Sequence, residues 1–423
     1  MGQSINKKKI INDPVYGFVP IPSELIFDLI QHPYFQRLRH IKQLGLTDFV
    51  YPGAIHTRFN HALGAMHLMG RVLDNLRLKG IEISPQEYEA SQIATLLHDI
   101  GHGPFSHALE ATLLHRVNHE SISFQFMKEL NASFNGQLQL ALQIFQNTYQ
   151  RKFFHQLVSS QLDTDRLDYL SRDSFFTGVS EGAVGVDRIV VMLNVSQDQL
   201  VVEEKGIYSI ENFLNARRLM YWQVYLHKTA VSAEQMLVNL IKRTQYLVQS
   251  GEALSCSQSL HFFLKASYTV EDFRRQEVIS HFGQMDDNDI WGAIKLWQNH
   301  PDHILSILCK MLLQRNLFQI ILTNDPIEKA TIEQVRSEIS NNYKVLRKDA
   351  SYLFSHGVVS NEAYVSEGQG IHILTKKGEL KEIADASDLP NIKALSKIVK
   401  KNYLCCPKNV SLKGSNIRSS NKN

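Results

Sequence analysis

The sequence predicts a mainly α-helical protein that carries a small β-hairpin insert and a smaller mixed α/β lobe towards its C-terminal end. Two observations lead to this prediction. Apolar residues recur at intervals of three and four through most of the first 330 residues, which is typical of amphipathic helices. Beyond about residue 330, apolar and polar residues alternate as they do in strands. With 423 residues, of which 43% are hydrophobic, the chain can bury a large core.

The helical periodicity is clearest in three segments, 23–45, 61–78 and 233–248, and Pro and Gly residues separate the helices. Residues 200–210 (LVVEEKGIYSI) contain two runs rich in strand-forming residues. They predict a hairpin with its turn at residues 205–206. We therefore expect a hairpin inserted into a helical domain.

The C-terminal part of the sequence changes in character. Residues 370–383 (GIHILTKKGELKEI) alternate in polarity around a turn at 376–378, which predicts strands in a smaller lobe. The last residues are rich in Ser, Asn and Lys. We expect a helical catalytic core over 1–330, a mixed α/β lobe over 331–410 and a basic, disordered tail over 411–423.

Charge and cysteine content limit the classes of function. The 45 Lys and Arg against 42 Asp and Glu leave a net charge of +3, which by itself argues for neither a nucleic-acid nor a membrane partner. The basic tail keeps nucleic acid as a weaker candidate partner. The four cysteines lack metal-ligand spacing, and no apolar run approaches the roughly 20 residues of a membrane span. These features predict a cytoplasmic location with reduced thiols.

The stretch LLHDIGHGPFSHALE, residues 96–110, places His98, Asp99 and His102 close together near the end of a helix. His98 and His102 would share one helical face, and Asp99 lies one position round. Gly101, Gly103 and Pro104 follow and break the helix, so that the next turn can fold back. This part of the helix can offer both a histidine and a carboxylate to one cation.

Two further segments contain the same types of ligand. His61 lies at the start of an apolar helix, and aspartates at 163, 165, 168 and 173 stand among leucines. An isolated His-Asp pair is common by chance, and single histidines are ordinarily core or surface residues; His67 and His115 we interpret that way. The density of histidines between 56 and 119 nevertheless favours a site with two imidazoles and two carboxylates, which suits Mn, Fe or Zn better than Mg.

The order His, then His-Asp, then Asp resembles the HD phosphohydrolase superfamily. The flanking stretches are similar to the deoxynucleoside triphosphate triphosphohydrolase branch, which includes enzymes that combine a sterile-alpha-motif domain with an HD domain. The similarity covers about residues 9–240, in NDPVYGF, FQRLRHIKQLG, YPGAIHTRFNHALGAMHL, LLHDIGHGPFSHALE, NHE and LDTDRLDYLSRDSFFTGV. It implies a helical HD-domain core and one divalent metal ion per site, with Mg as a further candidate to accompany the triphosphate of the substrate.

The resemblance also assigns roles to individual residues. The metal ligands would be His61, His98, Asp99 and Asp165. The catalytic residues would be His102 and His119 beside the phosphates and His107 as the acid, which the family pairs with an aspartate where this chain has Glu110. The substrate-binding residues would be Gln43 and Leu44 beside the sugar, Arg58, Arg166 and Arg217 on the phosphates, and Tyr169, Asp173 and Tyr225 around the deoxyribose.

The activity implied is hydrolysis of deoxynucleoside triphosphates to a deoxynucleoside and tripolyphosphate, by attack of water at the α-phosphorus. The alternative enzyme class is another HD phosphohydrolase, acting on a nucleoside monophosphate or a guanosine tetraphosphate-type alarmone. A protein without activity that binds nucleic acid through its tail is the third interpretation.

The resemblance implies partners as well as a reaction. We expect a homo-oligomer, either a dimer or a tetramer. Lys9, Gln36 and Arg39 match parts of an effector site at a subunit interface that binds a nucleotide. Gln31 replaces the acidic residue that reads a guanine at that site, so this resemblance gives no support for activation by a guanine nucleotide.

Overall fold

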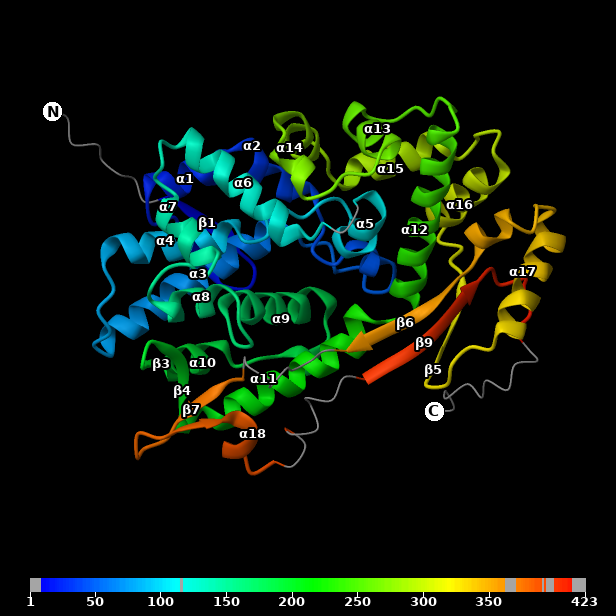
Figure 1. The fold of residues 1–423 in the computed structure, drawn as a ribbon. Coiled ribbons are helices and arrows are strands. Elements are labelled where there is room, and N and C mark those ends of the chain that lie inside the picture. The colour runs from blue at the N-terminus through cyan, green and yellow to red at the C-terminus, as the bar shows by residue number, and fades with distance from the viewer. Residues whose placement is uncertain (1–8, 115–116, 362–369, 390–391, 393–398, 413–423) are drawn as a thin grey trace.

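The prediction of a mainly α-helical fold is confirmed by the computed structural model, which describes residues 9–114, 117–361, 370–389, 392 and 399–412. In chain order the helices of the body are α1 (Glu24–Gln31), α2 (Pro33–Gln36), α3 (Arg58–Leu78), α4 (Pro85–Leu97), α5 (Ser106–Leu113), α6 (His119–Ser133), α7 (Gln139–Phe145), α8 (Lys152–Val158), α9 (Thr164–Thr177), α10 (Val186–Met192), α11 (Ile207–Met220), α12 (Lys228–Gln249), α13 (Gln258–Lys265), α14 (Gln276–Phe282), α15 (Asp287–Trp297) and α16 (His303–Leu313). Figure 1 shows this body with α11 running along one side of it.

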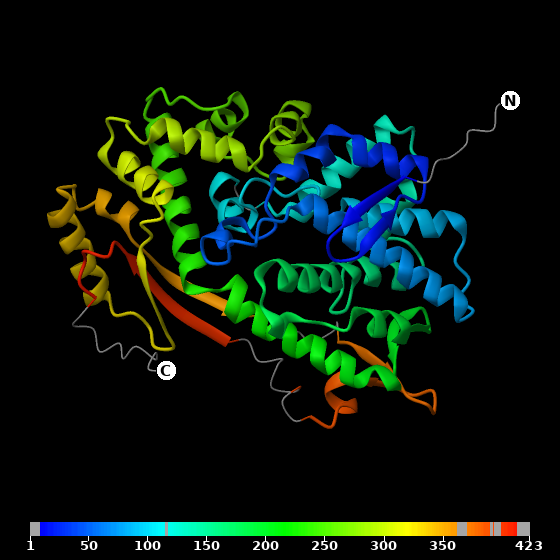
Figure 2. The same cartoon turned by 180° about the vertical axis from the view of Figure 1, so that it is seen from behind.

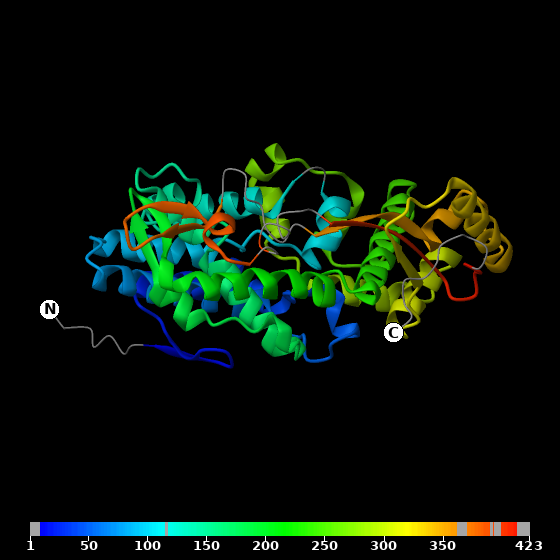
Figure 3. The ribbon, with the colours of Figure 1, turned by 90° about the horizontal axis from the view of Figure 1, so that it is seen from below.

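The described strands form three small sheets. An N-terminal ribbon pairs β1 (Ile10–Asp13) with β2 (Gly17–Pro20). A second sheet has the order β3 (Leu193–Ser196), β4 (Gln199–Glu203), β7 (His372–Leu374), β8 (Leu380–Glu382), and a third has the order β5 (Gln319–Thr323), β9 (Val399–Cys406), β6 (Ser355–Asn361). Helix α18 (Ile383–Ala386) follows β8, and α17 (Lys329–Tyr343) lies beside the third sheet. The second and third sheets lie towards opposite ends of an elongated molecule (Figures 1 and 3).

The predicted hairpin exists, but its predicted position is wrong. Strands β3 and β4 pair antiparallel with the turn at Gln197 and Asp198, whose φ angles of 51° and 59° suit the tight turns of two-residue hairpins. Residues 205–206 instead lead into α11, where Ile210, Phe213 and Leu214 face the core. The Val-Val run of β4 therefore pairs with the residues before it rather than with those after it.

The C-terminal part contributes strands to two sheets. The predicted alternation over 370–383 is confirmed as the β7–β8 hairpin, with Gly378 in the turn at a φ of 83°. Strand β7 also pairs in parallel with β4. It thereby attaches this hairpin to the helical body. Residues 413–423, most of the predicted tail, lie outside the described residues.

Two of the three predicted helical segments are found as continuous helices, and the segment 23–45 is broken twice, at His32 and again at Ile41, which is extended and follows a 3₁₀ turn over Arg37–His40. Segment 23–45 divides after α1, because His32 precedes Pro33 and adopts an extended ψ of 138°. Helices α3 and α12 extend the other two segments. Within the described residues, every helix is too short or too polar to cross a lipid bilayer.

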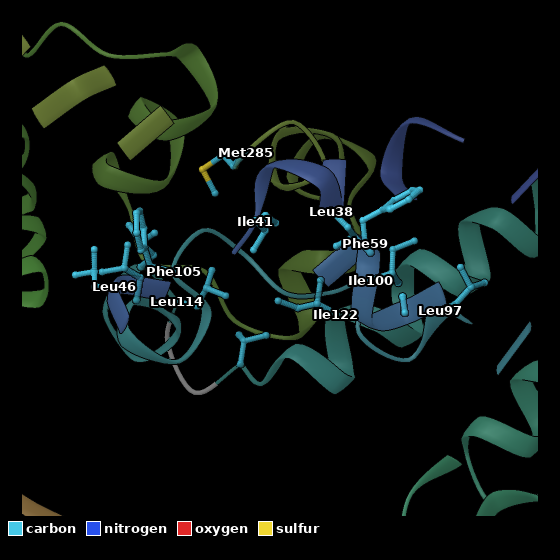
Figure 4. Close-up of a cluster of buried hydrophobic side chains, with 14 of the residues drawn as sticks. Leu38, Ile41, Leu46, Phe59, Leu97, Ile100, Phe105, Leu114, Ile122 and Met285 are labelled. Carbon is cyan, nitrogen blue, oxygen red and sulfur yellow. The ribbon is translucent and has the colours of Figure 1, made fainter. Parts of the chain in front are cut away.

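A large apolar cluster fixes the turn that follows α4. Leu97 and Ile100 are fully buried and gather with Phe59 from α3 and Ile122 from α6 (Figure 4). Beneath the turn, Arg37 donates hydrogen bonds to the carbonyls of Ile100 at 2.7 Å and His102 at 2.9 Å. Apolar packing and the buried guanidinium of Arg37 thus fix the backbone that carries the histidine cluster.

Candidate active site

Helix α3 brings His61 to the centre of the molecule. Thr57 and Asn60 form a capping box at its start, and His61, fully buried, follows one turn later. Gly64 allows α9 to come close, since a Cβ there would lie 2.0 Å from Oδ1 of Asp168. The close packing of α3 on α9 is what brings His61 towards the aspartates.

The turn after α4 carries His98, Asp99 and His102. Helix α4 ends at Leu97, so the prediction that His98 and His102 share a helical face is wrong. They are brought together by the turn itself, in which the His102 N–H donates to the Asp99 carbonyl at 3.1 Å. Gly101 is required in this turn because a Cβ would lie 2.2 Å from the Ser123 nitrogen of α6.

Helix α9 presents Asp165 from its first turn. Asp163 caps the helix by accepting the Arg166 N–H at 2.7 Å, and the side chain of Arg166 pairs with the same carboxylate. Because Asp163 is used in this way, Asp165 is the carboxylate that faces the histidines.

The four predicted metal ligands converge. Nε2 of His61 lies 3.0 Å from Oδ1 of Asp165, and Nε2 of His98 lies 3.4 Å from the same oxygen. Oδ1 of Asp99 lies 3.3 Å from Nε2 of His98. Among the described residues, neither Nε2 has a hydrogen-bond partner although both are buried. Two orphaned imidazole nitrogens facing two carboxylates fit a divalent metal ion, so this donor set could hold one.

The electrostatics of the cluster favour a positive charge. Burial lowers the pKa of His98, but the carboxylates of Asp99 and Asp165 outweigh it and raise the pKa to about 9. His61 behaves alike: burial opposes its charge, yet Asp165 and Asp168 raise its pKa to about 10. Although burial opposes their charge too, the two imidazoles hold the pKa of Asp165 below its usual range. Such a site demands either protons or a cation.

A second histidine pair adjoins the metal site. The rings of His102 and His119 stack with centroids 3.8 Å apart, and Nε2 of His102 lies 3.3 Å from Oδ1 of Asp99. Burial and the nearby Arg58 hold the pKa of His102 well below its usual range, which keeps that ring neutral. Asp99, His102 and His119 also form a second group of potential metal ligands.

Glu110 contacts His119 twice. One carboxylate oxygen accepts the His119 backbone N–H at 2.6 Å, and the other lies 3.4 Å from its Nδ1. The side chain of His107, the predicted acid, lies outside what the structure describes. Its pairing with Glu110 therefore stays a prediction.

One cavity of about 710 Å³ collects most of the predicted site. The predicted residues that line it are Gln43, Leu44, Arg58, His98, Asp99, His102, His119, Asp165, Arg166, Tyr169, Asp173 and Tyr225. Its volume is in the range of ligand pockets. His61 and Arg217 are buried and do not line the cavity; Arg217 donates to Oε1 of Gln161 at 3.0 Å.

Arg58 and Asp173 each have a partner within the cavity wall. Arg58 donates to Oδ2 of Asp99 at 2.6 Å. Asp173 accepts from the hydroxyl of Tyr225 at 2.8 Å, and Nε2 of His56 lies 2.7 Å from its other oxygen. Arg58, predicted to bind the phosphates, and Asp173, predicted to bind the sugar, are thus both oriented by neighbouring side chains.

The predicted effector residues lie near α1 and α2. Nζ of Lys9 lies 2.9 Å from the ring centroid of Phe27. Gln36 donates to the Ile30 carbonyl at 2.7 Å and accepts from Nε of Arg39 at 2.8 Å. These contacts are internal to the chain, and an effector site there stays a prediction.

Two contributors were missed from the sequence. Asp168 lies 2.7 Å from Nδ1 of His61 and pairs with Arg172, which in turn pairs with Asp13 of β1. The i,i+4 spacing of Asp168 and Arg172 was visible, but their place behind His61 was not. Asp287, at the start of α15, accepts the backbone N–H groups of Lys42 and Phe105 at 2.9 Å each. Nothing local in the sequence indicates that contact.

Comparisons with known proteins agree with this geometry. The HD domain family matches residues 58–173, and the HD associated region matches residues 184–254. Protein YwfO of Bacillus subtilis is 33% identical over 90% of this chain and 88% of its own. The crystal structure of a phosphohydrolase from Bacteroides thetaiotaomicron, 50% identical, superposes with a TM-score of 0.92 over 95% of this chain and all of that one.

A Dictyostelium discoideum deoxynucleoside triphosphate triphosphohydrolase SAMHD1 homolog is 31% identical over 66% of this chain and 59% of its own length. The chain belongs to the HD-domain phosphohydrolase family, is related to deoxynucleoside triphosphate triphosphohydrolases, and is a metal-binding hydrolase.

Proposed function

We propose that this protein hydrolyses deoxynucleoside triphosphates to a deoxynucleoside and tripolyphosphate. The observation that carries the proposal is the composition of the 710 Å³ cavity. Its wall combines the His98–Asp99–Asp165 cluster with two arginines. It also holds the Asp173–Tyr225 hydrogen bond, which suits a sugar hydroxyl. The named function of the Dictyostelium relative supports the same substrate class.

The metal site would be held by His61, His98, Asp99 and Asp165. A divalent ion held there would supply a Lewis acid for the phosphates and would lower the pKa of water. We propose Mn, Fe or Zn as this ion, because the ligand set combines two imidazoles with two carboxylates.

The chain's own residues bind and orient the triphosphate. Arg58 and Arg166 place cationic donors in the cavity, where phosphoryl transfer depends mainly on positioning and charge neutralisation. Arg217 lies behind the wall, so it acts on the phosphates only through a shift of its side chain or of Gln161. His102 is neutral and stacked on His119, so the pair can donate hydrogen bonds to phosphate oxygens.

The leaving 5′-oxygen needs a proton donor, since an alkoxide is a poor leaving group. His107 stays our candidate for that role, with Glu110 as its partner. Gln43, Leu44 and Tyr169 would crowd the 2′ position and so exclude ribonucleotides.

Product analysis tests the proposal. Purified protein with Mn would be incubated with each deoxynucleoside triphosphate and each ribonucleotide, and the products separated by ion-exchange chromatography. We expect intact tripolyphosphate from the deoxynucleotides, none from Asp165→Asn, and unchanged release from Asp187→Asn, which alters an exposed aspartate that pairs with Arg71 on the surface. Release of inorganic phosphate from monophosphates, or of pyrophosphate from an alarmone, with the triphosphates left intact, would instead assign the protein to another HD phosphohydrolase class.

A further inference from the structure

One carboxyl in the cavity has no place in the proposed chemistry. Glu234, on α12, is partly buried and lines the same 710 Å³ cavity as the metal cluster. Among the residues that the structure describes, no Lys, Arg or His pairs with it. A carboxyl in this position costs stability, because burial disfavours its ionised form. Burial raises the pKa of Glu234 to about 7, with no partner that opposes the shift.

Glu234 comes from a different part of the fold than the metal ligands and the two arginines of the cavity wall. The metal ligands and both arginines come from α3, the turn after α4, and α9, which pack on one another. Helix α12 packs instead on α5 and on the 3₁₀ helix η2 (Gly45–Phe49). In Figures 1 and 2, α5 lies between α12 and that helical group.

Tyr225 links the two parts of the cavity wall. It hydrogen-bonds Asp173 of α9, and it precedes α12 by only three residues. The Asp173–Tyr225 pair thus connects the helix that carries Asp165 to the segment that leads into the helix that carries Glu234. A nucleotide with its phosphates at the cluster and its sugar at Tyr225 would place its base towards Glu234.

The chemistry of a carboxyl limits what Glu234 can bind there. A carboxylate repels phosphate and accepts hydrogen bonds from N–H donors. The bases differ in these donors: guanine, cytosine and adenine carry an exocyclic amino group, whereas thymine carries none. Guanine also presents its N1–H beside the amino group, which matches the two oxygens of one carboxylate.

Resting on the proposed function, we infer that Glu234 is a specificity-determining residue that accepts hydrogen bonds from the amino edge of the base. It selects guanine first and rejects thymine. Four further wall residues, Gly45, Thr47, Ala108 and Leu226, carry no charge. Base recognition would explain why the protein keeps this carboxyl although its burial without a charged partner lowers stability.

The test compares kcat/KM for dGTP, dTTP and dITP, which is dGTP without the 2-amino group. For the wild-type protein with Mn we expect dGTP to exceed dTTP and dITP by about tenfold or more, as for hydrogen bonds to a charged group. Glu234→Gln should lower the dGTP-to-dTTP ratio by about tenfold. Glu120→Gln removes another, exposed carboxylate from the same cavity wall and should leave that ratio unchanged.

The outcomes are separable. Hydrolysis of all three substrates with equal ratios in wild type and Glu234→Gln overturns the assignment of Glu234 alone. Absence of hydrolysis of any deoxynucleotide by wild type overturns the proposed function, and the assignment with it. The comparison of dGTP with dITP uses the wild-type protein, so it does not depend on whether the variant folds. Equal kcat/KM of the wild-type protein for dGTP and dITP would overturn the inference.

Discussion

Oδ2 of Asp168 lies 2.7 Å from Nδ1 of His61, and this contact decides which nitrogen of the ring faces the other ligands. With Nδ1 facing Asp168, Nε2 is the nitrogen that faces Asp165 and Asp99. Arg172 pairs with the same carboxylate. The orientation of the His61 ring is therefore fixed by a buried chain of charged side chains, Asp168 and Arg172.

Asp168→Asn should weaken metal binding while leaving all four ligands in place. We expect the metal Kd to rise by about 10- to 100-fold, the usual cost of losing such a partner. Metal competition titrations with Mn and Zn would measure it. Asp187→Asn is the matched control, since it removes an exposed aspartate far from the cluster. An unchanged Kd would show that Asp168 does not orient His61.

Arg166→Ala should reduce the stabilisation of the transition state, because it removes a cationic donor from the cavity wall. The expected fall in kcat/KM for a deoxynucleoside triphosphate is roughly 10- to 100-fold. Steady-state kinetics would show it, with Arg71→Ala as the control because Arg71 does not line the cavity and pairs with the exposed Asp187. Because Arg166 also pairs with the capping Asp163, thermal unfolding of the variant should be recorded alongside. Equal kcat/KM in a folded variant would remove Arg166 from substrate binding.

Glu110→Gln should affect turnover more than binding. The substitution keeps an oxygen that can accept the His119 N–H but removes the negative charge beside its ring. We expect kcat to fall by about 100-fold with KM changed by less than about threefold, within the range of proton-transfer groups. His119→Ala should behave in the same direction. A change confined to KM would contradict a role in the chemical step.

Much of the site could be predicted because its ligands are unusual residues for a helical core. His61, His98 and Asp99 stood out against apolar neighbours, and Asp165 completed a ligand set of the right types. The structure brings these four together. The sequence did not reveal how the histidines are positioned. The turn after Leu97, rather than a shared helical face, presents them.

The partners behind the ligands could not be predicted, because they depend on packing between distant segments. Asp168 stands three residues after Asp165, and the sequence alone does not distinguish the two aspartates as metal ligands. The difference becomes visible only from the close packing of α9 against Gly64. Glu234 lies in an amphipathic helix, where a glutamate is ordinarily solvated. The hairpin was misplaced for two reasons: the second predicted strand run, residues 207–210, belongs to helix α11, and Gln197 and Asp198 gave no glycine signal for the turn.

Asp287 joins two loops of the cavity, and its charge should make stability depend on pH. Its two oxygens accept the N–H groups of Lys42 and Phe105, the latter at a left-handed φ of 48°. Burial raises the pKa of Asp287 from 3.8 to about 6 in spite of these bonds. The folded state therefore holds this proton more tightly than the unfolded chain, and the stability it confers is complete below about pH 4 and lost as the pH rises through 6.

Asp287→Asn cannot titrate, so the wild-type protein should lose stability relative to the variant between pH 4 and pH 7. The maximum change in the difference of their unfolding free energies is roughly 3 kcal/mol, from about two pKa units. Denaturant unfolding at both pH values would measure it. The amide also turns an N–H group towards one backbone N–H, so a constant destabilisation at both pH values is expected in addition. If the difference between the two proteins were the same at pH 4 and pH 7, the pKa of Asp287 would be the same in the folded and the unfolded protein, and burial would not raise it.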